Sequence, residues 1–578
     1  MTDKGIRQEF EKYTLEHYET EYADRHLLHG AIWKWAGETP DQIAIQEYNT
    51  DREFTYREFE EYSTALALRL LQMGFQKGDF LAVMLPLTAE HIFLEYACFQ
   101  IGVIHAPIDL RLKAAEVVRS LKMVQAKGFV FLGKTPIIDF DEIGRTVQEN
   151  CPFVNHLIQF AEPGVTIEGA HSAATLAVEA GGLLQRELES EAPTELGRQL
   201  QAAQDAVQPT DGAQVIYTTG STGLPKPALL SHRNITSQNM CLAAGFGYFQ
   251  STRMMVNLPP SHVGCQGEQL MTTFFGGKTA VILHMFDAEQ TLQAIDKYDV
   301  EVFGQIPAMF NMQWRLPNIS EYRLTSIQHA LFGGQQVPRE FVELLLDHYP
   351  LVGTGLGLSE MAGFVTYTGM TDDLDVLSGT LGWWMPITPL TIREPMCEDG
   401  TAGPEVPIGE TGEICFSGPQ VFIDYVNNPE AYAKTVSSDG ICYTGDLGSI
   451  GENGLVFSGR SKLVIKPKGY QIHPAQVESH FSQLKDQIAI CGAVGAEHKV
   501  FSEGVVLFVE VKPGVNLERE QLDQHAKGIA SFMRPLHYVL LEPGTFPLNR
   551  LSKIDYVKLS ELASLESHQL REQGGWDC

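Results

Sequence analysis

The segment at residues 216–227, Ile-Tyr-Thr-Thr-Gly-Ser-Thr-Gly-Leu-Pro-Lys-Pro, has the composition of a phosphate-binding loop. Glycine can enter turns whose exposed N–H groups point at an anion, hydroxyls add donors, and lysine adds a positive charge. The spacing is not the Walker pattern, because only two residues separate the glycines and no Ser or Thr follows the lysine. The alternative is a polar surface loop. The candidate phosphate contacts are Thr218, Thr219, Gly220, Ser221, Thr222, Gly223 and Lys226.

A single carboxylate, Glu360, follows the glycine-rich stretch Thr-Gly-Leu-Gly-Leu-Ser at residues 354–359. Mg²⁺ prefers oxygen ligands and commonly bridges a protein carboxylate and substrate phosphates. The apolar pair Leu351-Val352 predicts a strand that ends near Glu360, where ligands bind in open α/β sheets. Taken alone, Glu360 would be interpreted as a solvated loop carboxylate.

Three other segments carry residues suited to a nucleotide. In Tyr-Thr-Gly-Asp at residues 443–446, Asp446 can accept both hydroxyls of a ribose, and Arg460 fourteen residues later can reach the ribose or a phosphate. The run Phe-Gly-Gly-Gln-Gln at residues 332–336 offers a flat backbone to a ring or a carbonyl, although a plain strand–turn is the alternative. Lys553 near the C-terminus would, by itself, be a solvated surface charge.

Strands and helices alternate in the sequence that must position these residues. Thr55 and Glu58 predict a capping box at the start of a helix that Gly74 ends, and Pro338 fits the first residue of a helix that ends near His348. Such alternation predicts mainly parallel sheets with helices on their faces. The predicted strands are residues 80–85, 129–132, 215–217 and 300–306, and further predicted helices are residues 89–100 and 288–298, the latter capped by Asp287.

Two regions stand apart from this pattern. Residues 162–209 are rich in Ala, Glu, Gln and Gly, which predicts a surface excursion outside the core with one helix at about residues 182–206. After Gly459 a smaller unit begins, with a predicted strand at residues 505–511 and a terminal helix near residues 557–570. A chain of 578 residues is too long for one core, so two or more domains are expected.

The charge and the cysteines limit the class of protein. A formal net charge of −30 repels nucleic acid and anionic membranes, so any polyphosphate must be held by local Lys and Arg. Nine cysteines without Cys-x-x-Cys pairs indicate free thiols in a reducing cytoplasm, not a disulfide framework or a zinc site. The start of the chain does not resemble a secretory signal, and no run of about 18 apolar residues predicts a membrane span.

Together the motifs resemble those of the adenylate-forming superfamily, which includes acyl- and aryl-CoA ligases, carrier-loading adenylation domains and firefly luciferase. The loop at residues 218–227 is similar to the pattern T-S-G-T-T-G-x-P-K-G, and Phe-Pro-Leu-Asn-Arg-Leu-Ser-Lys-Ile-Asp at residues 546–555 to P-x-T-x-x-G-K-I-x-R. The matches run from about residue 54 to residue 555. The resemblance implies an α/β N-terminal domain of residues 1–459 and a small, mobile α+β C-terminal domain of residues 460–578, with a hinge at Lys462.

ATP, Mg²⁺ and coenzyme A are the cofactors that this resemblance implies. By this resemblance Lys553 matches the catalytic lysine and Asp446 matches the ribose-binding aspartate. Glu360 matches the magnesium-binding acid, and Thr222 is the second implied metal ligand. His262 matches a position that shields the acyl-adenylate, and a satisfied loop histidine is the alternative. The other implied nucleotide contacts are Gly333, Gly334, Gln335, Gly357, Ser359 and Arg460, and Lys466, Gly469 and Tyr470 are the positions implied for the second half-reaction.

Three residues depart from the family pattern. Pro227 replaces a glycine and has no N–H to donate to a phosphate. Leu356 replaces the aromatic residue that stacks on adenine, which predicts looser nucleotide binding. Ser552 replaces the glycine before the catalytic lysine, so the local turn is expected to differ.

The resemblance implies a cytoplasmic ligase that adenylates a carboxylic acid and transfers it to coenzyme A. The residues after His262 lack the aspartate of amino-acid-activating relatives, which disfavours an amino acid. The implied acid pocket suits a medium-chain acyl or aryl group. Its expected lining is Val263, Phe303, Met309, Phe332, Met361 and Phe364. The alternatives are a stand-alone enzyme that loads a separate carrier protein, a non-catalytic nucleotide-binding homologue and, more remotely, a luciferase-like oxygenase.

Overall fold

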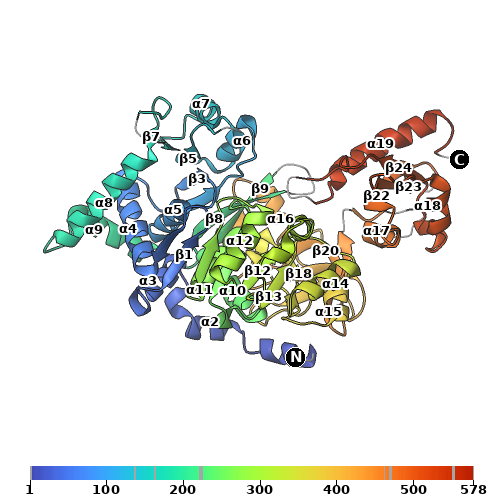
Figure 1. Ribbon diagram of the computed structural model, residues 1–578, viewed down its shortest axis with the longest axis horizontal. Coiled ribbons are helices and arrows are strands. Elements are labelled where there is room, and N and C mark those ends of the chain that lie inside the picture. Colours follow the sequence, from blue (N-terminus) through green and yellow to red (C-terminus); the bar gives the residue numbers. More distant parts are fainter. Residues whose placement is uncertain are drawn as a thin grey trace.

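The computed structural model describes residues 3–135, 138–161, 164–219, 225–460, 463–465, 467, 472–500, 502–549 and 553–576. In Figure 1 the chain up to about residue 460 forms a large body, and the C-terminal segment forms a smaller body on one side of it. Both bodies combine sheets and helices, and the sheets of the large body are mainly parallel. The predicted fold class is therefore confirmed.

A seven-stranded sheet occupies the middle of the large body. Its neighbouring strands pair in parallel, except for the first two strands of the chain, which form an antiparallel pair. In spatial order the strands are β14 (Val352–Gly353), β13 (His329–Phe332), β12 (Val302–Gln305), β10 (Arg253–Val256), β11 (Thr279–Ile282), β1 (Ile43–Glu47) and β2 (Arg52–Thr55).

An eight-stranded sheet carries the ends of the predicted phosphate loop. Six of its strands pair in parallel, whereas β9 runs antiparallel to both of its neighbours, β8 and β19. In spatial order the strands are β19 (Asp424–Tyr425), β9 (Pro225–Ser231), β8 (Gly212–Thr219), β4 (Ile104–Pro107), β3 (Phe80–Met84), β5 (Gly128–Leu132), β6 (His156–Phe160) and β7 (His171–Ser172).

Local sequence signals set most helix ends. Helix α4 (Tyr56–Gln72) begins at the predicted capping box, in which the Thr55 hydroxyl accepts from the backbone N–H of Glu58. Helix α5 coincides with the predicted segment, and the Asp287 carboxylate caps α12 by accepting from the backbone N–H of Gln290. Their bounds are α5 (Ala89–Gln100) and α12 (Ala288–Tyr298), and other helices that flank the sheets are α3 (Leu28–Glu38), α6 (Ala114–Val124), α7 (Phe140–Asn150), α10 (His232–Gly245) and α13 (Pro307–Trp314).

Two helix predictions need correction. Pro338 is not the first helical residue but the N-cap, with extended backbone, of α14 (Arg339–His348). The single helix expected at residues 182–206 is two helices, α8 (Ala173–Glu189) and α9 (Glu195–Ala206). The break contains Pro193, which disfavours helical backbone at the residue before it, and Thr194 then caps α9 by accepting from the Gly197 N–H, 3.0 Å away.

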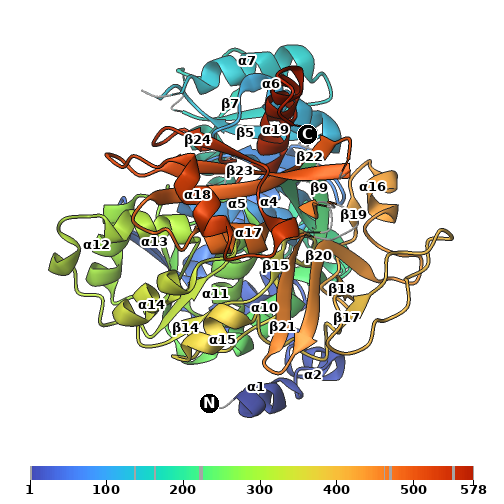
Figure 2. The same cartoon turned by 90° about the vertical axis from the view of Figure 1, so that its right-hand side faces the viewer.

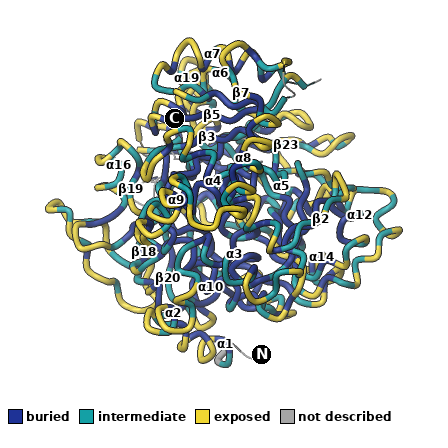
Figure 3. The backbone as a smooth tube through the Cα atoms, turned by 90° about the vertical axis from the view of Figure 1, so that its left-hand side faces the viewer, coloured by how far each residue is buried: buried dark blue, intermediate teal, exposed yellow. Residues whose placement is uncertain are grey.

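The excursion at residues 164–209 is also less superficial than predicted. Leu176, Leu183 and Leu200 are buried and pack in one cluster with Leu68 of α4 and Leu94 of α5. Helices α8 and α9 lie at one end of the molecule in Figure 1, and the exposed parts of their backbone are yellow in Figure 3. Each helix therefore presents an apolar stripe to the core and a polar face to water.

The C-terminal body has its own core. Its sheet packs against helices in two clusters of residues that lie between Ile465 and Trp576, whereas the clusters of the large body end at Phe457. Figure 2 shows this body in front of the large body, with the antiparallel sheet of that large body below it. The strands of this sheet are β17 (Leu390–Arg393), β18 (Gly412–Phe416), β20 (Cys442–Gly451) and β21 (Gly454–Arg460). Its elements are α17 (Pro474–Phe481), β22 (Ile488–His498), β23 (Ser502–Val511), α18 (Arg519–Ala526), β24 (His537–Leu541) and α19 (Tyr556–Glu572).

The helices of the described residues include none that combines the length and the apolar character needed to cross a bilayer.

Candidate active site

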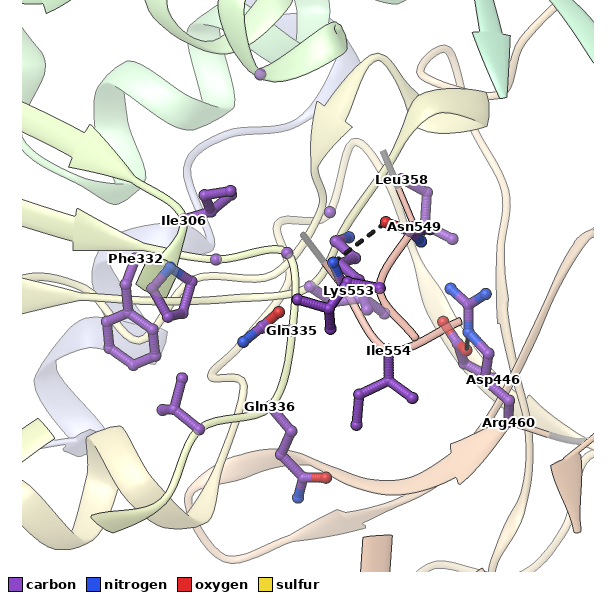
Figure 4. A pocket seen from close by; sticks show the side chains of 18 of the residues that line it. Ile306, Phe332, Gln335, Gln336, Leu358, Asp446, Arg460, Asn549, Lys553 and Ile554 are labelled. Carbon is purple, nitrogen blue, oxygen red and sulfur yellow. Dashed lines mark hydrogen bonds and ion pairs between the residues drawn. The ribbon is translucent and has the colours of Figure 1, made fainter. Parts of the chain in front are cut away.

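A cleft of about 2840 Å³ lies where the C-terminal body meets the large body. Residues from both bodies line it, and Figure 4 shows how Phe332, Asp446 and Lys553 surround it. Most of the predicted site residues that the structure describes lie in this lining. They are Thr218, Lys226, His262, Gly333, Gly334, Gln335, Gly357, Ser359, Glu360, Asp446, Arg460 and Lys553.

The two ends of the predicted phosphate loop are adjacent strands. Thr219 ends β8 and Pro225 begins β9, and Thr218 lies opposite Lys226 in their antiparallel pairing. Gly220, Ser221, Thr222 and Gly223 lie outside the described residues, so their assignment stays a prediction. The hydroxyl oxygen of Thr218 is buried and has no hydrogen-bond partner in the described part of the chain, which leaves it available to a ligand.

Pro227 lies within β9, beyond the loop itself. It is opposite Tyr217 of β8, and its carbonyl accepts a hydrogen bond of 2.9 Å from the backbone N–H of Val426. This position is therefore part of the sheet, where the proline still supplies an acceptor although it has no N–H.

Glu360 is held by a tyrosine that the sequence analysis did not single out. The hydroxyl of Tyr425 donates a hydrogen bond of 2.6 Å to Oε1 of Glu360, and Nζ of Lys226 lies 4.3 Å from the centre of the Tyr425 ring. The pairing of β19 with β9 brings Tyr425 opposite Ala228, next to the end of the phosphate loop. Tyr425 thus connects the predicted magnesium ligand with the predicted phosphate-binding lysine.

Asp446 and Arg460 face each other across two neighbouring strands. They are directly opposite in the pairing of β20 with β21, and Nε of Arg460 lies 3.1 Å from Oδ1 of Asp446. Asp446 is buried, which raises the pKa of its carboxyl, while the positive charges of Arg460 and Lys553 oppose that shift. Gly445 before it has φ +76°, a left-handed conformation that favours glycine, so the glycine of the Tyr-Thr-Gly-Asp motif is needed for the turn.

Lys553 reaches from the C-terminal body into the cleft. Its backbone N–H donates to Oδ1 of Asn549 at 3.1 Å and its carbonyl accepts from the Asn549 N–H at 2.8 Å, so Asn549 holds the Lys553 backbone in place. Burial and the charge of Arg460 lower the pKa of Lys553 to about 8, against the opposing effect of Asp446 and Glu268. Figure 4 shows the side chain between the glycine loop of the large body and the Asp446–Arg460 pair.

Lys553 lies against the glycine loop that follows β13 in the large body. Gly334 has φ +88°, and a β-carbon on it would lie 3.4 Å from Nζ of Lys553. Gly333 is equally constrained, because a β-carbon there would lie 2.8 Å from the ring of Phe364. The exposed Gln335 follows on the wall of the cleft.

The turn around Glu360 consists of short elements. β15 (Gly357–Leu358) pairs with β16 (Gly363–Phe364), and a 3₁₀ turn of Ser359–Met361 joins them. Leu356 is buried in the main core cluster, although it also lines the cleft. An apolar surface, without an aromatic ring, is therefore what this position offers to a ligand.

His262 and Glu268 both line the cleft beside Gly264. Nδ1 of His262 accepts a hydrogen bond of 3.1 Å from the Gly264 N–H, and burial together with the charges of Lys553 and Arg111 lowers the pKa of its imidazole to about 4. Glu268, on the π-helix η3 (Gly264–Met271), has its pKa raised to about 8 by burial. A neutral imidazole and a largely protonated carboxyl thus face the cleft at neutral pH.

Four of the six residues expected to line the acid pocket line the cleft, and their role in binding the acid stays a prediction. Val263, Phe332, Met361 and Phe364 line the cleft. Phe303 instead packs against Phe310 of α13 and Tyr349 in an apolar cluster, and Met309 of α13 is buried outside the cleft lining.

Other predictions fall outside the described residues. They are the hinge residue Lys462, the second-step residues Lys466, Gly469 and Tyr470, and Ser552 before the catalytic lysine. Their roles, and the domain boundary at residue 460, stay predictions.

Two residues of the site were missed in the sequence. Tyr425 has no local signal, because its contact with Glu360 depends on pairing between β19 and β9, nearly 200 residues apart in the chain. Glu268 did have a local signal, because it is the only Asp, Glu, Lys or Arg in residues 257–276. An isolated acid in such a segment, next to a site motif, indicates a candidate functional residue.

Comparison with known proteins gives consistent matches along the chain. A model of the AMP-binding enzyme family matches residues 32–426. A 4-coumarate–CoA ligase of Pinus taeda is 25% identical, with 93% of this chain and 95% of that protein covered, and a mitochondrial medium-chain acyl-CoA ligase of Macaca fascicularis is 25% identical, with 92% and 86% covered. The structure of ATP-bound MatB from Rhodopseudomonas palustris superposes with a TM-score of 0.78 at 21% identity, covering 93% of this chain and 99% of MatB.

Proposed function

Because this chain belongs to the AMP-binding enzyme family, which confirms the adenylate-forming resemblance, we propose that it is an ATP-dependent acid–thiol ligase. The observation that carries the proposal is the position of Lys553, which reaches across the cleft to Gly334 while Asp446 and Glu360 line the same cleft. A cation next to a metal-binding carboxylate and a ribose acceptor is the arrangement that adenylation requires. The proposed domains are residues 1–459 and residues 460–578.

In the first proposed step, a carboxylate oxygen of the acid attacks the α-phosphorus of ATP. The bond from that phosphorus to the bridging oxygen breaks, and pyrophosphate leaves with the electron pair. Both reactants are anions, so the site must offset their repulsion with fixed positive charge and hold them in line. Lys553 and Lys226, which both line the cleft, supply that charge, and Asp446 accepts hydrogen bonds from the ribose hydroxyls.

Magnesium would be held by Glu360, with Thr222 as the second predicted ligand, and would neutralise charge on the phosphates. The described part of the chain contains no group of three or more His, Cys, Asp or Glu side chains placed to hold a metal. This fits an ion held mainly by substrate phosphates and one protein carboxylate, which is common for Mg²⁺. The Tyr425 hydroxyl fixes the direction of that carboxylate.

In the second proposed step, the sulfur of a thiol attacks the acyl carbon, AMP leaves and the thiol proton is released. We propose coenzyme A as the thiol, and a separate carrier protein remains the alternative. We propose a medium-chain acyl or aryl acid, in line with the two relatives named for such substrates. We also propose that the enzyme acts in the cytoplasm.

The test is AMP release from ATP with a panel of carboxylic acids, with and without coenzyme A. Asp446→Ala should weaken ATP binding by roughly 1.5–3 kcal/mol, because a charged hydrogen-bond acceptor is lost. Glu360→Ala should raise the Mg²⁺ requirement. If no acid yields AMP or pyrophosphate exchange, the chain is a non-catalytic homologue. Thioester formed only on a carrier protein would favour the alternative acceptor.

A further inference from the structure

Glu268 is a partly buried carboxyl group in the cleft that the proposed adenylation chemistry does not use. It lies on η3, in the segment that also carries His262, and it lines the cleft among apolar side chains that include Leu258, Val263 and Phe364. Departures from α-helical geometry of this kind are often associated with functional sites.

The backbone around Glu268 leaves room for its side chain. A β-carbon on Gly363 would lie 2.7 Å from Cγ and 2.9 Å from Oε1 of Glu268, and one on Gly357 would lie 3.3 Å from Oε1. A β-carbon on Gly264 would be 3.4 Å from Oε2 and 3.1 Å from Nδ1 of His262. Three glycines thus surround the carboxyl group, and one of its oxygens is on the same side of Gly264 as the His262 imidazole.

The carboxyl group of Glu268 has few hydrogen-bond or ion-pair partners among the described residues. The Phe364 backbone N–H is its hydrogen-bond donor, and Lys553 acts on it only as a charge, because the described residues form no ion pair with Glu268. Near the same point, Nε2 of the fully buried Gln238 has no hydrogen-bond partner among the described residues and would lie 2.8 Å from a β-carbon on Gly363. Burying an acid with so few partners costs free energy, since desolvation favours its neutral form.

A ligand can remove that cost. A plain alkyl or aryl acid would leave Glu268 against hydrocarbon, whereas an amino or hydroxyl group on the acid would donate a hydrogen bond to it. A site that contains a buried polar group discriminates strongly against an analogue that cannot pair with it. The adjacent His262, expected next to the acyl-adenylate, indicates that the donor is near the reacting carboxyl group.

We propose that Glu268 determines substrate specificity, and that the preferred substrate is a carboxylic acid bearing an amino or hydroxyl hydrogen-bond donor near its carboxyl group. This inference rests on the proposed function and narrows its substrate class. It replaces the purely apolar acid pocket expected from the sequence with a pocket that contains one carboxyl group. That group belongs to Glu268, which directly follows the Val-Gly-Cys-Gln-Gly segment at residues 263–267.

The experiment uses pairs of benzoates that differ only in the group at one ring position. Aminobenzoates and hydroxybenzoates, substituted ortho, meta or para, are compared with the corresponding methylbenzoates for acid-dependent pyrophosphate exchange. For at least one position, the wild-type enzyme should prefer the donor by about 100-fold in kcat/KM. Glu268→Leu should abolish or reverse the preference, and the nearly isosteric Glu268→Gln should reduce it. Comparing amino with hydroxyl compounds identifies the donor.

The matched control is Glu116→Gln, another acid in the cleft lining, which should leave the donor preference unchanged. If Glu268 served only to balance the charge of Lys553, both Glu268 variants would lower kcat for donor and methyl compounds by the same factor. That result, or equal use of donor and methyl compounds by the wild type, would overturn the proposal but leave the ligase function intact. Failure of every acid would instead reject the proposed function.

Discussion

The Tyr425 hydroxyl lies 2.6 Å from Oε1 of Glu360, and its ring lies 4.3 Å from Nζ of Lys226. One side chain therefore contacts both the predicted metal ligand and a predicted phosphate ligand. The hydrogen bond restricts the carboxylate to one orientation, and the ring restricts the position of the lysine. A residue in such an outer position affects a metal site without contacting the metal.

Tyr425→Phe keeps the ring beneath Lys226 but removes the hydroxyl from Glu360. Loss of an outer partner of a metal ligand typically costs 10–100-fold in metal affinity. The Mg²⁺ concentration at half-maximal pyrophosphate exchange should therefore rise at least about tenfold, while KM for the acid changes little. Tyr432→Phe, which alters a tyrosine that packs on Phe422 nearby, is the control. An unchanged Mg²⁺ dependence would show that Glu360 needs no orientation by Tyr425.

Lys553 should make the rate of adenylation fall at high pH, as a basic limb in the pH profile. Its pKa is lowered to about 8, so the charged form that stabilises the reacting anions declines as pH rises through that value. In wild type, kcat/KM for pyrophosphate exchange should fall above about pH 8, since this parameter reports the free enzyme. In Lys553→Arg the limb should disappear from the range up to pH 9.5, because arginine stays protonated. A limb at the same pH in that variant would assign it to another group.

Much of the framework could be predicted because its signals are local. The Thr55–Glu58 capping box, the ends of α5 and the Asp287 cap depend on residues within four positions of one another. Asp446 and Lys553 were likewise found from short motifs. Pro338 and the break at Pro193 show the limit of such signals, since proline fits both the cap and the first turn and can divide a helix.

The remainder depends on contacts between distant segments. Tyr425 meets Glu360 only after β19 pairs with β9, and the space for Glu268 exists only when glycines 264, 357 and 363 converge. The surface excursion predicted for residues 162–209 needed correction for the same reason, because Leu176 and Leu200 are buried. Composition suggested a solvated excursion, but packing against α4 and α5 buries them.

Buried histidines should make the protein acid-sensitive, and His232 allows a direct test. It is fully buried, its Nδ1 accepts from the Leu28 N–H at 3.3 Å, and burial lowers its pKa to about 3. As pH falls below 6.5, the unfolded state binds a proton that the folded state excludes, so the free energy of unfolding falls. The loss from one such imidazole is about 1.4 kcal/mol at pH 5.5.

The measurement is urea unfolding of wild type and His232→Gln between pH 7.5 and 5.5. The variant should be less stable at pH 7.5, but its stability should decline less on acidification. Glu95, whose pKa is raised to about 8 by burial, contributes an opposite trend that is common to both proteins and cancels in the comparison. Parallel stability curves would contradict a neutral, buried His232.

The hinge at Lys462 gives a test of domain alternation. Lys553 already lies beside Gly334 and Asp446, the position proposed for adenylation, whereas Lys466 and Tyr470 of the same C-terminal body are predicted to act in the second step. One placement of that body cannot serve both steps, so rotation about Lys462, two residues after β21, is expected. Proline restricts φ, so Lys462→Pro should prevent the rotation.

Each half-reaction is assayed alone on the purified variants. Lys462→Pro should retain pyrophosphate exchange within a few-fold and lose thioester formation from supplied acyl-adenylate and coenzyme A, whereas Lys462→Ala should retain both. Lys553→Ala should show the complementary defect, a loss on the order of 10²–10³ in pyrophosphate exchange with thioester formation preserved, because only the first step needs its charge. Normal thioester formation in Lys462→Pro would reject the hinge. Equal loss of both half-reactions in Lys553→Ala would make that lysine a structural residue and remove the reason for alternation.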